Sequence, residues 1–178
     1  MKAIGTIDSS KNFIDFEIEK PILRPHDLLI KVEAISINPV DTKVRKGIKG
    51  NLAEPKILGW DGLGTVVELG SETKLFKVGD KVFWAGDVTR SGSNAEFQAV
   101  DERIVGFAPK NLTKEKAVAM PLTSLTAYEL LFEKLEVTDE SKGKSLLIIN
   151  GAGGVGSVAI QLANNAGLTV IATASNPQ

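Results

Sequence analysis

Up to about residue 108, apolar residues recur at short, alternating intervals between turn-forming residues. Leu28, Ile30, Val32 and Ala34 share one parity within residues 27–36, which predicts a half-buried β-strand. Many short strands separated by turns predict a compact, barrel-like β unit. The other elements predicted in this part of the chain are strands over residues 13–18, 64–70, 78–83, 95–100 and 104–107, and a short helix over residues 41–46 that Gly47 ends.

Beyond Pro109 the period of the pattern changes. Residues 113–120 and 121–135 place apolar side chains at helical intervals, which predicts two helices. We therefore divide the chain into a β-rich first domain, residues 1–120, and a second domain, residues 121–178.

The segment from residue 145 to residue 175 has the most specific pattern. The apolar run 146–149 predicts a strand buried on both faces, and a second buried strand is predicted over 168–172. Between them, apolar positions at the spacing of one helix face lead to Gly167, which stands where a left-handed residue would end that helix. Strand, turn, helix and strand in this order predict a right-handed crossover with parallel strands. The turn matches G-x-G-x-x-G and consists of Gly151, Ala152, Gly153, Gly154, Val155 and Gly156.

The glycines of this turn favour a dinucleotide site. Gly151 would allow the tight turn off the strand, Gly153 would let the backbone approach a pyrophosphate, and Gly156 would let the helix pack close to the sheet. The free N–H groups at the start of the helix would then bind the phosphates. A glycine-rich turn without a ligand is the alternative, but the strand before the turn and the helix after it favour binding. A phosphate loop of the G-x-x-x-x-G-K-[ST] type is excluded, because Thr138 stands where its first glycine belongs.

The end of the second strand indicates which dinucleotide is bound. An NAD site has an Asp or Glu there that accepts hydrogen bonds from the ribose hydroxyls. Residues 174–176 are Ala, Ser and Asn, so no carboxylate opposes a 2′-phosphate, and Ser175 could donate a hydrogen bond to one. The sequence therefore favours NADP(H), although no arginine follows to pair with the phosphate.

Composition narrows the class of protein. Hydrophobic residues make up 43% and charged residues 24% of the chain, as in ordinary globular proteins. A net charge of −1 offers no basic surface for nucleic acid or for a membrane. There is no cysteine for disulfides, and no apolar run resembles a signal peptide or a membrane span. We therefore expect a cytoplasmic protein with no nucleic-acid or membrane partner.

Five segments form a set with a characteristic order: Asn38–Asp41 with Arg45 and Gly47, Gly59–Gly64, Val78–Val82, Pro121–Tyr128 and Asn150–Gly156. With this set the chain resembles the medium-chain dehydrogenase/reductase superfamily, and most closely its zinc-independent quinone oxidoreductase and zinc-type alcohol dehydrogenase-like branch. The resemblance implies a GroES-like β-barrel catalytic domain followed by the first βαβ unit of a Rossmann dinucleotide-binding domain. Chains of this family are nearly twice as long, so the sequence looks truncated, and a homodimer is possible for the full-length form.

The resemblance also bears on metal chemistry. Zinc-dependent relatives have a Cys where Asn38 stands and a His-Glu pair where Trp60 and Asp61 stand. A catalytic zinc takes three protein ligands, mainly Cys, His and carboxylates. This chain has no Cys, and its one histidine, His26, is predicted to be an exposed loop residue. We therefore expect no zinc.

Without a Lewis acid, simple alcohol oxidation is disfavoured. Hydride transfer from NADPH to a quinone or another α,β-unsaturated carbonyl requires less, because the resulting enolate is delocalised. Such a reaction needs hydrogen-bond donors for the substrate oxygen and a later proton. The sequence therefore favours an NADPH-dependent quinone or enone reductase with a small-molecule carbonyl substrate.

The resemblance implies roles for three residues, each with a structural alternative. Asn38 lies beside the nicotinamide and the substrate, where its amide could donate, or it only forms a turn. Trp60 walls the space that zinc leaves and presents its indole N–H, or it is a core aromatic residue. Thr126 contacts the nicotinamide side, or its hydroxyl bonds back to the preceding helical turn. Asn38 and Trp60 are thus the predicted catalytic residues, and Asn38, Thr126 and Ser175 join the glycine turn as predicted cofactor contacts.

Two further predictions concern the first domain. Asp41 and Arg45 are four residues apart in a predicted helix and are expected to form a structural ion pair. Residues 91–94, Ser-Gly-Ser-Asn, are expected to be a mobile loop near the cleft or a simple surface turn.

Two other functions stay open from the sequence. The protein could bind or sense NADPH without catalysis, or the short chain could be an inert fragment. Half of a dinucleotide domain supplies the pyrophosphate turn but lacks the half that holds the nicotinamide. We therefore predict that residues 1–178 alone bind NADPH weakly or not at all and show no turnover.

Overall fold

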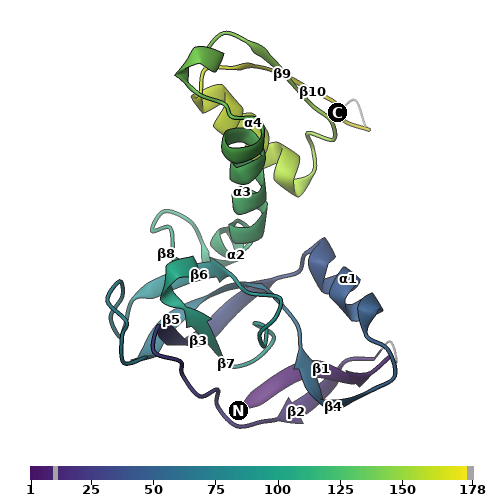
Figure 1. Ribbon diagram of the computed structural model, residues 1–178, viewed down its shortest axis with the longest axis vertical. Helices are drawn as coiled ribbons and strands as arrows, with labels where there is room; N and C mark the ends of the chain where they lie inside the picture. Colours follow the sequence, from purple (N-terminus) through teal and green to yellow (C-terminus); the bar gives the residue numbers. More distant parts are fainter. Residues whose placement is uncertain (10–11, 176–178) are drawn as a thin grey trace. The chain divides into compact units, whose positions relative to one another are not determined.

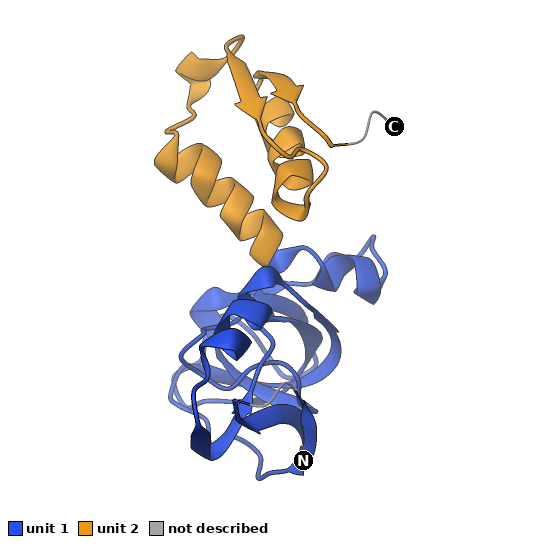
Figure 2. Cartoon of the chain, turned by 90° about the vertical axis from the view of Figure 1, so that its right-hand side faces the viewer, with its two compact units in different colours: residues 1–121 blue, residues 122–178 orange. Residues whose placement is uncertain are grey.

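A computed structural model describes residues 1–9 and 12–175 of the chain. The chain divides into two compact units, Met1–Pro121 and Leu122–Gln178, which are called unit 1 and unit 2 (Figure 2). Unit 1 contains most of the β-strands, whereas unit 2 combines helices with a two-stranded sheet (Figure 1). Within the described ranges, no helix has the length and apolar character needed to cross a membrane.

Unit 1 is built on a five-stranded antiparallel sheet with the strand order β7-β3-β5-β6-β8. The strand predicted over residues 27–36 is confirmed with the same bounds as β3. The alternating apolar positions of these strands form one buried cluster that includes Leu28, Ile30 and Trp84. The strands are β3 (Asp27–Ser36), β5 (Asp61–Leu69), β6 (Lys81–Ala85), β7 (Phe97–Asp101) and β8 (Val105–Phe107).

A second sheet of unit 1 has the strand order β2-β1-β4, with β1 at Lys2–Asp8, β2 at Ile14–Glu17 and β4 at Asn51–Ile57. One isolated bridge, Ala3 to Ala95, connects it to the chain that leads into β7. The expected barrel-like unit is therefore present as two sheets, and among the described residues they do not close into one hydrogen-bonded barrel.

Unit 1 also contains short helices. α1 (Pro39–Gly47) begins directly after Asn38, and the fixed φ of proline suits the first helical position. A 3-10 turn, Glu102–Ile104, joins β7 to β8, and α2 (Lys114–Val118) buries Ala117 and Val118 in a cluster with Leu63 of β5.

Unit 2 contains the strand, glycine turn, helix and strand that the sequence predicts. β9 (Ser145–Ile148) and β10 (Thr169–Ala172) pair in parallel, and α4 (Gly154–Asn165) lies between them in the chain. Gly167 has φ = +83°, as predicted for the residue that ends the helix. The preceding helical segment comprises α3 (Pro121–Tyr128), a single stretch of π-helix (Glu129–Lys134) and a 3-10 turn (Asp139–Ser141).

The prediction that both strands of unit 2 are buried on both faces is wrong for this chain. One face packs with α4 around Ala159 and Ala163. On the other face, Leu147, Ile149 and Ile171 are exposed. The reason is that the sheet has only two strands and that only one of its faces is covered within the described residues.

Candidate functional site

Asn38 lies between β3 and α1, where its backbone begins the helix and its side chain faces the sheet. The backbone N–H of Asn38 donates to Asp41 Oδ2 at 2.6 Å, as in a capping box. The Asn38 side chain donates through Nδ2 to Asp61 Oδ2 at 2.8 Å. Asn38 is 7% exposed and Asp61 is 0% exposed, so this contact is shielded from water.

Asp61 is the first residue of β5 and is paired on both sides within the sheet. Its ladder partners are Ser36 in β3 and Ala85 in β6. The sequence predicts no role for Asp61, which stands in the Gly59–Gly64 motif and at the position of the Glu of zinc-dependent relatives. The signal that could have found it is a carboxylate at the start of a glycine-rich apolar strand, because such a buried acid requires a hydrogen-bonding partner.

Residues 91–94 are not a simple surface turn, because only Ser91 is exposed. Ser93 and Asn94 line a cavity, and the mobility of the segment stays a prediction. Ser93 is buried, and its hydroxyl donates to the Asp61 carbonyl oxygen at 2.9 Å. The backbone N–H groups of Ser93 and Asn94 donate to the carbonyl oxygens of Gly59 and Leu58. Gly59 has φ = +96°, and a Cβ there would lie 2.6 Å from Ser93 Oγ. Glycine at position 59 therefore lets this segment pack against the start of β5.

Trp60, one of the predicted catalytic residues, is 1% exposed. Its indole Nε1–H donates to the Asp87 carbonyl oxygen at 3.0 Å. This is the behaviour of a core aromatic residue whose polar atom is satisfied within unit 1. A role for Trp60 in contact with substrate stays a prediction.

The predicted ion pair between Asp41 and Arg45 is wrong. Asp41 accepts the hydrogen bond from the Asn38 backbone instead, and no ion pair joins it to Arg45, although the structure describes both residues. The Arg45 guanidinium lies 5.8 Å from the centre of the Phe13 ring. The Asp41 carboxylate therefore caps the start of α1, and it does not pair with Arg45 as the four-residue spacing predicts.

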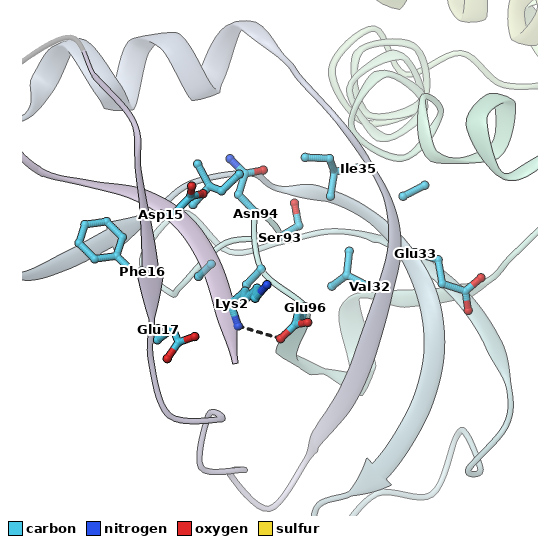
Figure 3. Close-up of a pocket in the computed structure, with 14 residues that line it drawn as sticks. Lys2, Asp15, Phe16, Glu17, Val32, Glu33, Ile35, Ser93, Asn94 and Glu96 are labelled. Carbon is cyan, nitrogen blue, oxygen red and sulfur yellow. Dashed lines mark hydrogen bonds between the residues drawn. The ribbon is translucent and has the colours of Figure 1, made fainter.

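Unit 1 has a cavity of about 710 Å³ between β1, β2, the second half of β3 and residues 93–96 (Figure 3). Apolar side chains such as Val32 and Ile35 line it together with carboxylates, and Glu96 accepts a hydrogen bond from the Lys2 backbone N–H at 2.7 Å. Ser93 also lines this cavity, and its hydroxyl bonds to the Asp61 backbone, so the wall of the cavity is connected to Asp61.

A second cavity of about 590 Å³ lies beside α1, where Thr42 and Ile48 line it with Phe13. It shares Ile4 and Asn94 with the first cavity. Neither Asn38 nor Trp60 is among the described residues that line the two cavities. The volumes are in the range of small-molecule sites.

The glycine turn of unit 2 is a compact backbone structure. The Gly151 N–H donates to the Thr173 carbonyl oxygen at 2.7 Å, which ties the turn to the end of β10. A Cβ on Gly151 would lie 2.7 Å from the Ala172 Cβ. A Cβ on Gly156 would overlap the Asn150 carbonyl oxygen and the Gly151 backbone, so α4 approaches the turn more closely than any side chain permits.

The first turn of α4 offers its N–H groups to a ligand. Gly153 is the residue before the helix and has extended backbone angles, and no side chain caps the helix at this end. No side chain therefore occupies the N–H groups of Gly154, Val155 and Gly156, and their binding to a phosphate stays a prediction. Ala152, within the turn, is exposed.

Two predicted cofactor contacts in unit 2 lie outside this turn. The Thr126 hydroxyl donates to the Leu122 carbonyl oxygen at 2.7 Å, which is the hydrogen bond to the preceding helical turn that is the structural alternative for this residue. Ser175 is exposed beyond β10, and Asn176 lies outside the described residues. Contacts of Thr126 and Ser175 with a cofactor stay predictions.

The alcohol dehydrogenase GroES-like domain family matches residues 24–121. The chain therefore belongs to this family and, as its relatives also indicate, to the medium-chain dehydrogenase/reductase superfamily. The predicted fold class, a GroES-like domain followed by a βαβ unit, is confirmed.

Relatives at the level of sequence come from bacteria and plants. A zinc-type alcohol dehydrogenase-like protein of Staphylococcus aureus is 47% identical over all of this chain and 55% of its own length. A chloroplastic NADPH-dependent alkenal/one oxidoreductase of Arabidopsis thaliana is 39% identical over 90% of this chain and 42% of its own length. The chain thus spans about half the length of the curated relatives it matches.

Solved structures support the same relationship. An alcohol dehydrogenase superfamily protein from Novosphingobium aromaticivorans superposes with a TM-score of 0.90 at 36% identity, over 99% of this chain and 54% of the other. The Escherichia coli quinone oxidoreductase, whose structure is a complex with NADPH, superposes with a TM-score of 0.83 at 27% identity, over all of this chain and 54% of the other.

The name of the staphylococcal relative raises the question of whether the residues present fit zinc. The chain has no cysteine, and the part of it that the structure describes holds no group of three or more His, Cys, Asp or Glu side chains suited to a metal ion. His26 lies next to two carboxylates, with Nε2 at 3.2 Å from Glu72 Oε2, and Asp61 accepts from an amide. The donor set of these residues does not fit a catalytic zinc.

Proposed function

We propose that the protein transfers a hydride from NADPH to a quinone or another α,β-unsaturated carbonyl without the help of zinc. The observation that carries the proposal is the backbone cradle of unit 2, in which Gly151 and Gly156 leave no space for side chains and the N-terminus of α4 is uncapped. Such a cradle fits the pyrophosphate of a dinucleotide.

In this proposal the six residues of the glycine turn hold the cofactor through their backbone. The N–H groups of residues 154–156 bind the phosphates, and the exposed Ser175 donates to the 2′-phosphate. NADPH supplies the hydride when it is bound. The relatives support this choice of cofactor, since one is described as NADPH-dependent and another forms a complex with NADPH.

Asn38 supplies the hydrogen-bond donor for the substrate oxygen. Its amide nitrogen carries two N–H groups, and one of them is bonded to Asp61. The other can stabilise the negative charge that develops on the carbonyl oxygen. An amide does not release a proton at neutral pH, so the proton that completes the reduction comes from solvent or from another side chain. Trp60, whose indole N–H is already bonded, contributes an apolar wall.

The test is the oxidation of NADPH by the full-length protein with a quinone and an enone as acceptors, and with NADH in parallel. We expect turnover with NADPH that a zinc chelator leaves unchanged. Asn38→Ala should lower kcat about 10²–10³-fold with little change in KM for NADPH, as for the loss of one oxyanion donor. Asn111→Ala, a change of an exposed asparagine, is the matched control and should leave kcat unchanged.

Failure has a distinct signature for each part of the proposal. The absence of turnover with every acceptor, despite bound NADPH, would leave a binding or sensing protein in place of an enzyme. A preference for NADH would contradict the choice of cofactor, and inhibition by the chelator would contradict the zinc-free mechanism.

A further inference from the structure

The geometry points to Asp61 as the residue that positions the Asn38 amide for the substrate. This inference deepens the proposed function and rests on it, because Asn38 is the donor in that proposal. In the proposed reaction Asp61 touches neither substrate nor cofactor, and it acts through Asn38.

The contact between the two residues is short, buried and distant in sequence. Asn38 Nδ2 lies 2.8 Å from Asp61 Oδ2, across 23 residues of chain. Both side chains are buried, so water does not compete for the bond. A hydrogen bond that is shielded from water holds its two side chains in place more strongly than an exposed one.

The hydrogen bond between Asn38 and Asp61 determines which end of the Asn38 amide faces the substrate oxygen. The two ends of an asparagine side chain differ, because the oxygen accepts hydrogen bonds and the nitrogen donates them. Asp61 Oδ2 accepts from the nitrogen end of Asn38, so this is the end that is held against β5. One N–H is bonded to Asp61, and the second leaves the same nitrogen in a fixed direction. A donor with a fixed direction needs no reorganisation during the reaction.

The position of Asp61 is itself fixed by the sheet. Its backbone pairs with Ser36 on one side and Ala85 on the other, and Ser93 Oγ donates to its carbonyl oxygen at 2.9 Å. Asn38, by contrast, lies outside the strands, two residues after Ser36. A side chain at the end of a helix is thus oriented by a rigid strand, which is the arrangement that keeps a reacting group in place.

A double-mutant cycle in the full-length protein tests this role. We expect Asp61→Asn to lower kcat about 10–10²-fold while KM for NADPH changes less than about twofold, because the asparagine can pair with either end of the Asn38 amide. In the Asn38→Ala background the same change should lower kcat less than about twofold further, since there is no amide left to position. Losses that multiply in the two backgrounds, or an unchanged kcat in Asp61→Asn, would overturn the inference.

Asp27→Asn is the matched control for damage to the fold. Asp27 is a buried carboxylate at the start of β3 and is bonded to Arg90, away from Asn38. Its replacement should lower stability but leave kcat unchanged at temperatures where the variant is folded. A fall in kcat in Asp27→Asn equal to that in Asp61→Asn would show that general loss of structure, and not positioning, explains the result.

A second measurement separates this inference from the proposed function. Exchange of the Asn38 Nδ2 protons with solvent can be followed by NMR on asparagine-labelled protein, whether or not the protein turns over. Slow exchange in the wild type that becomes fast in Asp61→Asn supports positioning. Equal exchange in both proteins overturns it. If the wild type shows slow exchange but no turnover, the proposed function is overturned and the positioning of Asn38 by Asp61 is retained.

Discussion

Unit 1 presents its candidate chemistry through side chains, and unit 2 presents its candidate chemistry through the backbone. In unit 1, the Asn38 amide is held by Asp61, and Ser93 supports Asp61 in turn. In unit 2, the cradle consists of N–H groups and of glycines whose missing side chains make room for close approach.

This difference determines how each site responds to change. The contacts of Asn38 join residues that are far apart in sequence, so they exist only when the sheets of unit 1 are packed. The cradle is formed by consecutive residues and depends on the conformation of one turn. Unit 1 should therefore lose its site through damage anywhere in its core, whereas unit 2 should lose its site only through damage to the turn.

The largest effect is expected from the core of unit 1. Trp84 is 1% exposed, belongs to the main apolar cluster and donates from its indole to Gln98 Oε1 at 2.9 Å. Trp84→Ala should lower the free energy of unfolding of unit 1 by about 3–5 kcal/mol. Chemical denaturation measures this loss, and hydrogen exchange of the α4 amides should stay unchanged. An equal loss of stability in α4, seen as faster hydrogen exchange of its amides, would contradict the expectation that damage to the core of unit 1 leaves unit 2 unchanged. Trp84→Phe, which keeps most of the volume, should cost less.

The ion pair of Asp27 with Arg90 gives a pH-dependent test of unit 1. Burial alone would raise the pKa of Asp27, but the hydrogen bonds from Arg90 and from the Arg24 backbone outweigh it and hold that pKa below its ordinary value. A carboxyl group with a lowered pKa in the folded state stabilises the protein above its unfolded pKa of about 4 and loses this contribution as the pH falls further.

Asp27→Asn should therefore lower the free energy of unfolding at neutral pH by about 3 kcal/mol, because it leaves Arg90 without its charged partner. It should also make the decline of stability below about pH 4 shallower than in the wild type. Urea denaturation across this pH range measures both effects. An acid limb that is as steep in the variant as in the wild type would contradict the assignment to Asp27.

A smaller effect is expected at the cradle of unit 2. Gly156→Ala places a Cβ against the Asn150 carbonyl oxygen and the Gly151 backbone, so the turn or the helix must shift. Overpacking of this kind costs about 1–3 kcal/mol of folding stability. Where the shift also displaces the N–H groups that bind the phosphates, NADPH binding should weaken by up to about 150-fold. Titration calorimetry on the full-length protein checks this value. Gly47→Ala, where a Cβ meets no atom within 4 Å, is the control and should bind NADPH as the wild type does.

The smallest effect is expected on the open face of unit 2. Ile171 is 56% exposed, and Ile171→Thr should change the free energy of unfolding of residues 1–178 by less than about 0.5 kcal/mol. The neighbouring Val170 packs against the cluster under α4, and Val170→Thr should cost about 1 kcal/mol or more. Thermal or chemical unfolding of the two variants compares the faces. Equal losses would mean that the Ile171 face is covered in solution.

The contrast between the units also explains what could be predicted from the sequence. The crossover of unit 2 follows from local patterns, because a short apolar run, a glycine turn and a helical face are each visible within a few residues. β10 was predicted over 168–172 and is found at Thr169–Ala172. The exposure of Leu147 and Ile171 was not predicted, because an apolar strand has the same pattern whether or not a neighbour covers it.

In unit 1 the strand at 27–36 was predicted from its alternation, but β1 and β4 were not predicted. β4 contains Pro55 and several polar residues, so its pattern is weak, and its pairing with β1 stabilises it. The partners of Asn38 and Asp41 could not be predicted either. Spacing favoured a bond from Asp41 to Arg45, whereas the capping of α1 by Asp41 depends on where the helix begins.

The left-handed glycine at position 59 has a practical consequence for any mutant library made in unit 1. In a mutant library that varies position 59, most variants would have a displaced 91–94 segment, because any Cβ at position 59 would overlap Ser93 and Asn94. Phe13, Thr42 and Ile48, which line the cavity beside α1, can be randomised without touching that anchor. Directed evolution of this scaffold should accordingly begin at those three positions and keep codon 59 constant.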